Sequence, residues 1–551
     1  MFKKGRRPLD FWTVITALLF VLFLIFLVAP LLSLLLSGFR SPETNAFTLD
    51  NFRRFFQKKY YYQALGNSFA ISFSVTALVL LVGVPLAYLM TFFHIKGKGF
   101  VQILIIISML SPSFIGAYSW ILLLGRSGVV TKFFAHLGIQ TPTIYGFGGM
   151  LLVFTLKLFP LVYLYVSGAM KKIDTSLVEA SSSLGCKPVR NVITLIMPLI
   201  LPTLLAAVLM VFMNSLADFG TPMLIGEGFR VMPVLVYKEF MSEVGSNANF
   251  AASIAIIIIC VTTGLYLLQR RVVNKMSFRM TTIKSIEPKT LTGVKGFFAH
   301  LYIYGIVLLA IIPQITVIYT SFLKTNGSVF VSGFSLNSYR TMFSKMASTI
   351  GNTYLYSFAA IIIIVILAML MAYVSVRRRN VFTSILDIVT MFPYIISGSI
   401  LGIMLLMAFN KPPLMISGTA MIIILAFVIR RLPHTLRSSV AILYQINPSV
   451  EEAAISLGES PGKAFFKVTA VMMIPGVLSG AILSWISIIN ELSASIILHT
   501  GSTKTMSVAI YNEVFRASYG TAAAISTVLT VTTVAALLIF FKATGKKEIS
   551  L

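Results

Sequence analysis

The chain has 551 residues, of which 57% are hydrophobic and 11% are charged, and its mean hydropathy is +0.91. This composition excludes a water-soluble domain, because the surface of such a domain must be largely polar. The formal net charge is +27, but no soluble basic face with interleaved aromatic residues accompanies it, so no nucleic-acid partner is expected. Anionic lipid headgroups are the expected partners of the basic residues.

Long apolar runs recur along the chain and are continuous rather than alternating. A helix of about 20 apolar residues crosses a bilayer, and lipid accepts only helices or closed barrels. The predicted fold class is therefore all-α, a polytopic membrane protein with about twelve transmembrane helices. The predicted spans lie near residues 11–37, 66–92, 100–124, 147–168, 194–225 and 249–269, and near 297–322, 350–376, 382–409, 414–434, 468–498 and 520–542.

The distribution of basic residues predicts the orientation of these spans. Lys and Arg collect in the short loops on the cytoplasmic side of a membrane. Most of the 44 basic residues fall in the N-terminal segment and in every second connection after it. We therefore expect both termini in the cytoplasm. The first span is longer than the apolar region of a signal peptide and is expected to be retained.

The two halves of the chain repeat each other. The segment 178–185 aligns with 451–458, and the same offset brings Pro202 to Pro475 and Asp218 to Glu491. Each half contributes six predicted spans, so both copies have the same orientation, which is typical of a parallel repeat about an axis along the membrane normal. The predicted domains are residues 1–285 and 286–551, joined by the basic stretch 270–296.

A polar loop separates the fourth and fifth spans of each half, at residues 170–192 and 435–467. Each loop contains a predicted short helix, which ends at a glycine that favours positive φ, Gly185 or Gly458. Ser176 and Ser449 are the predicted N-caps, each with a glutamate three residues later that would complete a capping box. Two such helices on the cytoplasmic side indicate docking sites for a partner that is itself two-fold.

At these loops the sequence resembles a known family. Its signature is Glu-Ala-Ala-x-x-Leu-Gly, followed by an apolar position and then by Leu-Pro, and it occurs in the permeases of ABC importers. The second copy fits closely, except that Val471 replaces the proline; the first copy has Ser181 for an alanine and Val192 for an aromatic residue. The residues that carry the resemblance and its implied contact with the ATP-binding subunit are Glu179, Ala180, Gly185, Glu452, Ala453, Gly458 and Phe465.

The resemblance implies a fused type I ABC importer permease in the bacterial cytoplasmic (inner) membrane. Its implied partners are a dimer of ATP-binding subunits, which would bind ATP and Mg, and an extracytoplasmic substrate-binding protein. The motifs at 217–222 and 490–494 resemble those of the ferric-iron uptake group, which is close to permeases for thiamine, polyamines, phosphonates and sugar phosphates. An ion-driven secondary transporter is a more distant alternative, and a membrane-bound enzyme a third.

Four charged residues in the predicted spans are candidates for a translocation pathway. Asp218 and Glu491 either flank the pathway and favour a cationic or metal substrate, or cap broken helices. Lys157 and Arg430 either line the cavity, pair with these acids or reach to the cytoplasmic interface. The chain has no P-loop motif and its five His are scattered, so no catalytic residue, metal site or cofactor is predicted within it.

Overall fold

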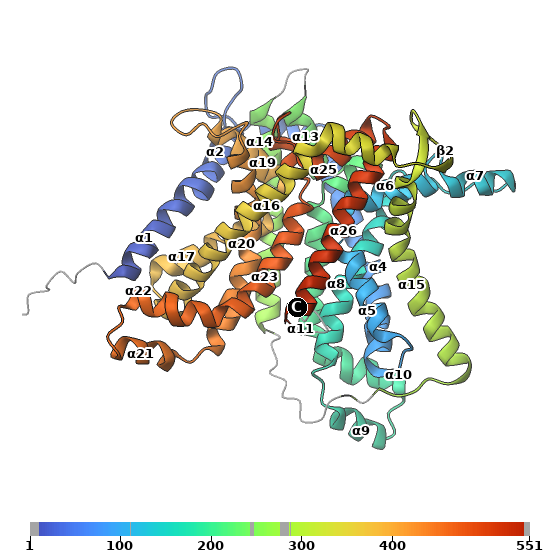
Figure 1. The fold of residues 1–551 in the computed structure, drawn as a ribbon, viewed down its shortest axis with the longest axis horizontal. Helices are drawn as coiled ribbons and strands as arrows, with labels where there is room; N and C mark the ends of the chain where they lie inside the picture. Colours follow the sequence, from blue (N-terminus) through green and yellow to red (C-terminus); the bar gives the residue numbers. More distant parts are fainter. Residues whose placement is uncertain (1–9, 111, 243–246, 276–285, 287, 545–551) are drawn as a thin grey trace, which may run out of the picture.

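The structure, a computed structural model, describes residues 10–110, 112–242, 247–275, 286 and 288–544, which form a helical bundle with one small hairpin (Figure 1). The first half contains α1 (Phe11–Phe23), the π-helical turn η1 (Leu24–Val28), α2 (Ala29–Gly38), α3 (Asp50–Gln57), α4 (Lys59–Phe92), α5 (Lys98–Leu110), α6 (Ser113–Leu124), α7 (Val129–His136), α8 (Phe147–Met170), α9 (Thr175–Ser183), α10 (Pro188–Asn191), η2 (Val192–Ile196), α11 (Met197–Ala217), α12 (Gly220–Ile225), α13 (Met232–Met241) and α14 (Ala248–Lys275).

The second half repeats this order with one added hairpin. Its elements are α15 (Gly293–Ser321), β1 (Leu323–Asn326), β2 (Val329–Phe334), α16 (Asn337–Arg377), α17 (Val381–Val389), α18 (Phe392–Ile395), α19 (Gly398–Phe409), α20 (Ala420–Gln445), α21 (Pro448–Ser456), α22 (Pro461–Ala464), η3 (Phe465–Thr469), α23 (Ala470–Ile489), α24 (Ser495–Leu498), α25 (Met506–Phe515) and α26 (Tyr519–Thr544). The antiparallel pair β1–β2 follows the first long helix of this half.

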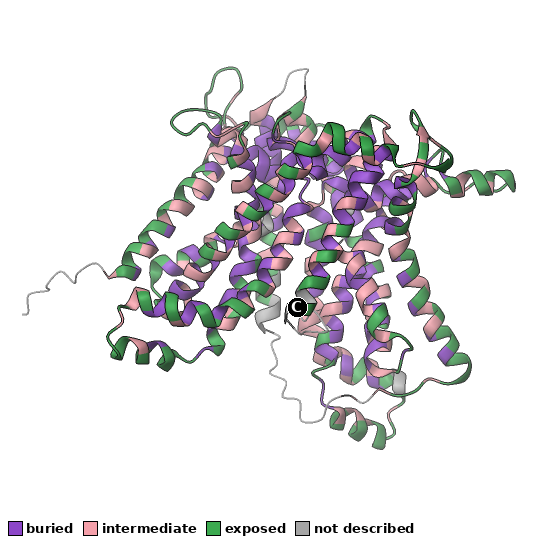
Figure 2. Cartoon of the chain, viewed as in Figure 1, coloured by how far each residue is buried: buried purple, intermediate pink, exposed green. Residues whose placement is uncertain are grey.

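The predicted membrane-spanning character is confirmed. By length and composition, 10 helices within the described ranges are long and apolar enough to cross a bilayer, and α5 and α19 are shorter apolar helices. Many large apolar side chains on these helices stay exposed, such as Leu81, Leu308 and Ile362. Figure 2 shows exposed residues on the outer faces of the bundle and buried residues where helices meet. This pattern fits helices whose outer solvent is lipid.

Four predicted spans are interrupted rather than continuous. The predicted span 100–124 is divided into α5 and α6, and 382–409 is divided into α17, α18 and α19. The predicted spans 194–225 and 468–498 break at equivalent places, after Ala217 and after Ile489. At each of these last two breaks, a polar segment lies where the two halves meet. The two acidic residues of the functional site lie in these segments.

The first helix of each half packs on the other half. In the N-terminal half, α1 contacts α16 and α17, and α2 contacts α19. Conversely, α15 contacts α5, α6 and α8, and it stands beside them at the edge of the bundle in Figure 1. Each first helix also packs on the last helix of its own half, α2 on α14 and α15 on α26, so it bridges the two halves.

The two halves have the same orientation, as the repeat predicted. The short helices α9 and α21 lie at the same end of the molecule, on opposite sides (Figure 1). The helices α13 and α25, which are also equivalent in the repeat, lie at the opposite end. Because a partner is expected to dock on α9 and α21, we call these two the coupling helices, their end of the molecule the coupling end and the opposite end the outer end.

Candidate functional site

A cavity of about 400 Å³ lies between the two halves and brings all four predicted pathway residues together. Its charged and titratable lining residues are Lys157 on α8, Asp218 after α11, Arg430, Arg431 and His434 on α20, and Glu491 after α23. Asn214, Ser487, Asn490 and Ser493 add polar groups, and Met109, Met210, Met213 and Tyr165 add apolar and aromatic surface. Both halves therefore contribute equivalent segments to one cavity.

Asp218 occupies the break between α11 and α12. Its Oδ2 lies 3.3 Å from Nζ of Lys157, and its Oδ1 accepts a hydrogen bond from the backbone N–H of Thr221 at 2.9 Å. The backbone of Asp218 is extended, which ends α11, and its carboxylate satisfies an amide that begins α12. The residue thus caps a broken helix and lines the cavity at the same time.

Glu491 repeats this arrangement in the second half with a stronger ion pair. Its Oε2 lies 2.8 Å from Nη2 of Arg431 and 3.1 Å from Nε of Arg430, and its Oε1 accepts from the backbone N–H of Ala494 at 3.3 Å. The side chain is buried, and two guanidinium groups compensate its charge. A methyl group on Gly398 would overlap the guanidinium of Arg430, so the glycine leaves room for this pair.

These contacts decide between the alternatives that the sequence left open. Lys157 and Arg430 pair with the acids and line the cavity. The lining is not negative overall, because it holds three basic side chains and two carboxylates. That the two acids favour a cationic substrate stays a prediction. Arg431, the third base, is the neighbour of a predicted residue and could have been found by its place in the same helix.

The coupling helices α9 and α21 occupy the two predicted loops, but their N-caps differ from the prediction. Asp174 accepts a hydrogen bond from the backbone N–H of Ser176 at 3.0 Å, and Asn447 accepts from Ser449 at 3.1 Å. The helices therefore begin before the two serines, and the glutamates of the motif lie beyond the position that a capping box requires. Asp and Asn stabilise a helix N-terminus as well as Ser does, and here they precede the serines in the chain and begin the helices.

The C-terminal ends of the coupling helices match the prediction. Gly185 has a φ of 81° and Gly458 a φ of 97°, and both amides bond back to the last helical turn. The leucines directly before them, Leu184 and Leu457, are 88% and 87% exposed. Glu179, Ala180, Glu452, Ala453 and both glycines are also exposed. Each coupling helix thus presents an apolar tip and a small, acidic face away from the bundle.

Phe465 is not part of this exposed surface. Its ring is buried and packs edge-on against Trp12, with centroids 5.0 Å apart, and against Tyr373 at 4.8 Å. The prediction that it contacts the ATP-binding subunit is therefore wrong for this structure. Phe465 instead connects the loop after α21 to α1 and α16.

Glu451 is a residue whose role the sequence analysis missed. It is buried, its Oε1 accepts a hydrogen bond from the hydroxyl of Tyr373, and its Oε2 accepts from Thr469 at 2.7 Å. The first half has Val178, Val192 and Ile196 where the second has Glu451, Phe465 and Thr469. The sequence did contain a signal for this role: within an otherwise repeated motif, the apolar residue of the first copy is a glutamate in the second.

An exposed ion pair also lies in the second coupling loop. Nζ of Lys467 lies 2.6 Å from Oε1 of Glu459, and this hydrogen bond holds the pKa of the glutamate below its usual value. Because both side chains are on the surface, the pair adds little to stability.

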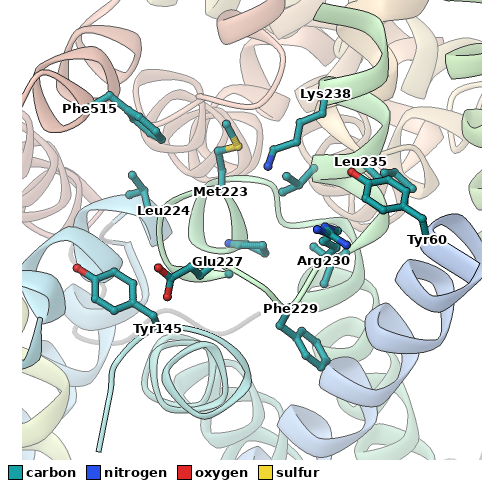
Figure 3. A pocket seen from close by; sticks show the side chains of 14 residues that line it. Tyr60, Tyr145, Met223, Leu224, Glu227, Phe229, Arg230, Leu235, Lys238 and Phe515 are labelled. Atoms are coloured by element: carbon teal, nitrogen blue, oxygen red, sulfur yellow. The ribbon is translucent and has the colours of Figure 1, made fainter. Parts of the chain in front are cut away.

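A second pocket, of about 230 Å³, lies at the outer end beside the connection between α12 and α13 (Figure 3). Arg230 stacks over the ring of Tyr60 at 4.4 Å, and Glu227 is 2.5 Å from Arg126. Lys238 and Tyr145 also line the pocket. The repeat gives the second half Thr500 where the first has Glu227, so the pair of Glu227 with Arg126 is not repeated there.

The chain is similar to known transport proteins. The "Ferric transport system permease protein FbpB" of Actinobacillus pleuropneumoniae is 28% identical over 550 residues, covering 96% of this chain and 78% of that protein. A putative ferric transport system permease protein, FbpB 1 of Haemophilus influenzae, is 27% identical over 510 residues, covering 89% and 79%. The putative 2-aminoethylphosphonate transport system permease protein PhnU of Salmonella typhi is 28% identical over 236 residues, covering 42% and 81%.

The family model described as "Binding-protein-dependent transport system inner membrane component" matches residues 80–278 and 360–543. One match falls in each half, and together they cover more than half of the chain. Each match also contains one coupling helix and one charged break at the cavity. The chain therefore belongs to this family: it is the multi-pass, non-catalytic permease of a binding-protein-dependent ABC importer, with two copies of the family domain fused in one polypeptide.

Proposed function

We propose that this permease imports ferric iron into the cytoplasm. The observation that carries the proposal is the similarity to a ferric transport permease along 96% of the chain. A phosphonate permease is the second candidate, and its similarity extends over 42% of the chain. The larger coverage includes both halves and both charged breaks of the cavity, and this favours iron.

Energy comes, in this proposal, from two ATP-binding subunits that dock on α9 and α21 and bind ATP and Mg. The support is the exposed apolar tip of each helix, Leu184 and Leu457, at equivalent positions on the same end of the molecule. A matching pair of exposed leucines suits a two-fold partner, since burying each leucine contributes about 1.5–3 kcal/mol. The coupling end would then face the cytoplasm.

Transport would follow alternating access. Closure of the ATP-binding subunits on ATP would draw α9 and α21 together and open the cavity toward the outer end, where the substrate-binding protein docks. The rigid connection from α21 through Glu451 to α16 supports this transmission, because a displaced coupling helix carries a membrane-spanning helix with it.

The test is uptake by the complete transporter in lipid vesicles. The permease, its ATP-binding subunit and its binding protein would be reconstituted with ATP on the coupling side. Radioactive ferric iron, 2-aminoethylphosphonate and thiamine would be supplied separately on the outer side. We expect ATP-dependent uptake of iron alone. Uptake of the phosphonate or of thiamine without iron would refute the assignment of iron.

A further inference from the structure

We infer that the cavity accepts its cargo as a species bearing a phosphate-type oxyanion, so that iron passes as a ferric ion with such a ligand rather than as bare Fe³⁺. The inference rests on the proposed function for the identity of the metal, and on the charges of the cavity for the oxyanion. It specifies which chemical group faces the protein during passage.

The charge balance of the cavity is positive. Its lining holds three basic side chains, Lys157, Arg430 and Arg431, against the two carboxylates of Asp218 and Glu491. A trivalent cation would meet one more positive than negative charge, among side chains that are at most 26% exposed, where charges act more strongly on each other than in bulk water. Each phosphate-type ligand on the iron lowers this positive charge and presents oxygens to the basic side chains.

The two carboxylates are already engaged. In Asp218 one oxygen faces Lys157 and the other accepts from the amide of Thr221, and Glu491 uses its oxygens in the equivalent way. Within the described residues there is no group of three or more His, Cys, Asp or Glu that could hold a metal ion. Coordination of iron by both carboxylates would therefore break both helix caps and all three ion pairs.

The basic groups are more available than the acidic ones. The side chains of Lys157, Arg431 and Arg430 are 26%, 20% and 17% exposed, whereas those of Asp218 and Glu491 are 11% and 3% exposed. A guanidinium has five N–H donors in a planar fork that matches phosphate-type oxygens, and an ammonium has three. Each base is already paired with a carboxylate, so its contact with a passing oxyanion stays weak. The contact must be weak because the cargo has to be released.

The same chemistry is offered by two sources, an oxyanion on a ferric ion and the head of an organophosphonate. We commit to the ferric complex because the ferric relatives match both halves that build the cavity. The organophosphonate is the second arm of the experiment.

The experiment compares two substitutions that break the same ion pair with opposite effects on charge. Lys157→Gln removes a positive charge, and Asp218→Asn removes a negative one. Each variant would be reconstituted with its ATP-binding subunit and binding protein, and initial uptake of ⁵⁵Fe³⁺ supplied with ³²P-labelled inorganic phosphate would be measured. Copurification of the ATP-binding subunit shows that each variant is folded and assembled.

We expect uptake by the Asp218→Asn transporter to exceed that by the Lys157→Gln transporter by about tenfold, because the two variants differ by two unit charges in a partly buried cavity. We also expect both labels to enter with the wild-type transporter. Equal losses in the two variants would mean that the pair is only structural, and a larger loss in Asp218→Asn would mean that a bare cation is carried. Either result, or entry of ⁵⁵Fe without ³²P, overturns the inference.

The second arm separates this inference from the proposed function. The same variants would be tested with 2-aminoethylphosphonate in place of iron. If the wild-type transporter takes up the phosphonate but no iron, the iron assignment fails, and an excess of Asp218→Asn over Lys157→Gln would still support an oxyanion site. If iron enters and the two variants are equal, the proposed function stands and the oxyanion inference fails.

Discussion

The hydroxyl of Tyr373 in α16 donates a hydrogen bond to the buried carboxylate of Glu451 in α21, so the second coupling helix is tied directly to a membrane-spanning helix. Thr469 donates to the other carboxylate oxygen, and the ring of Trp12 stacks on Tyr373 with centroids 4.0 Å apart. The first half has no glutamate at the equivalent position, where Val178 stands. The two coupling helices are therefore attached to the bundle in different ways.

This attachment predicts different roles for two adjacent glutamates. Glu451→Gln should lower the free energy of unfolding by about 1–3 kcal/mol, because it weakens two buried hydrogen bonds to a carboxylate. Glu452→Gln, one residue later and exposed, should leave stability within about 0.5 kcal/mol. Thermal unfolding in detergent provides the measurement. Equal stability of the two variants would show that the buried network does not hold α21.

The aromatic cluster around Phe465 predicts a loss of packing in the permease itself. Phe465→Ala should destabilise by about 3–5 kcal/mol, because the ring is fully buried between Trp12 and Tyr373. Val192→Ala, the equivalent change in the first half, should destabilise less because Val192 is half-buried and smaller.

The matched control for Phe465 is its neighbour, Phe466, which is 56% exposed. Phe466→Ala should change stability by no more than about 0.5 kcal/mol. Melting temperatures of the isolated permease measure all three variants. If Phe465→Ala melts like the wild type and only loses the ATP-binding subunit, the ring contacts that partner after all.

Positive φ at Gly185 and Gly458 predicts that a β-branched residue distorts the end of each coupling helix. No other atom lies within 4 Å of a Cβ added at either glycine, so the effect of Val would come from the backbone alone, at about 1–2 kcal/mol. Substrate-stimulated ATP hydrolysis should fall in Gly185→Val and in Gly458→Val. Asn, which tolerates this conformation, should restore most of it. Val and Asn variants with equal activity would contradict the role of these helix ends.

Much of the fold follows from the sequence because the bilayer selects it. Apolar runs such as 11–37 and 147–168 are long enough to span, and a helix is the way to satisfy their backbone. The repeat predicted two halves of equal orientation and two coupling helices with glycine ends. The contacts of the first helices with the other half were not predictable, because a repeat records duplication and carries no information on which copies pack together.

The sequence predicted which residues form the site, but not which of them contact each other. Asp218, Glu491, Lys157 and Arg430 were identified because charges in apolar spans are costly. Which acid pairs with which base depends on how four helices cross. The hydrophobic periodicity of the sequence does not determine that crossing. Phe465 was misassigned because its neighbour, Trp12, comes from the opposite end of the chain. Asp174 and Asn447 were overlooked as N-caps. Each lies just before the predicted serine, so the error was to choose the wrong one of two neighbouring candidates.

The most direct test of the account concerns Leu184 and Leu457, the exposed tips of the two coupling helices. In the double variant Leu184→Asp with Leu457→Asp, docking of the ATP-binding subunits would have to bury two carboxylates in place of two apolar side chains. The measurement is ATP-dependent ⁵⁵Fe uptake and ATP hydrolysis by the reconstituted transporter, with Leu137→Asp, an exposed leucine just after α7 at the outer end, as control. We predict that the double variant inserts and melts like the wild type but loses uptake at least about tenfold, while the control keeps it. Unchanged uptake and hydrolysis in the double variant would contradict the assignment of α9 and α21 as the coupling helices.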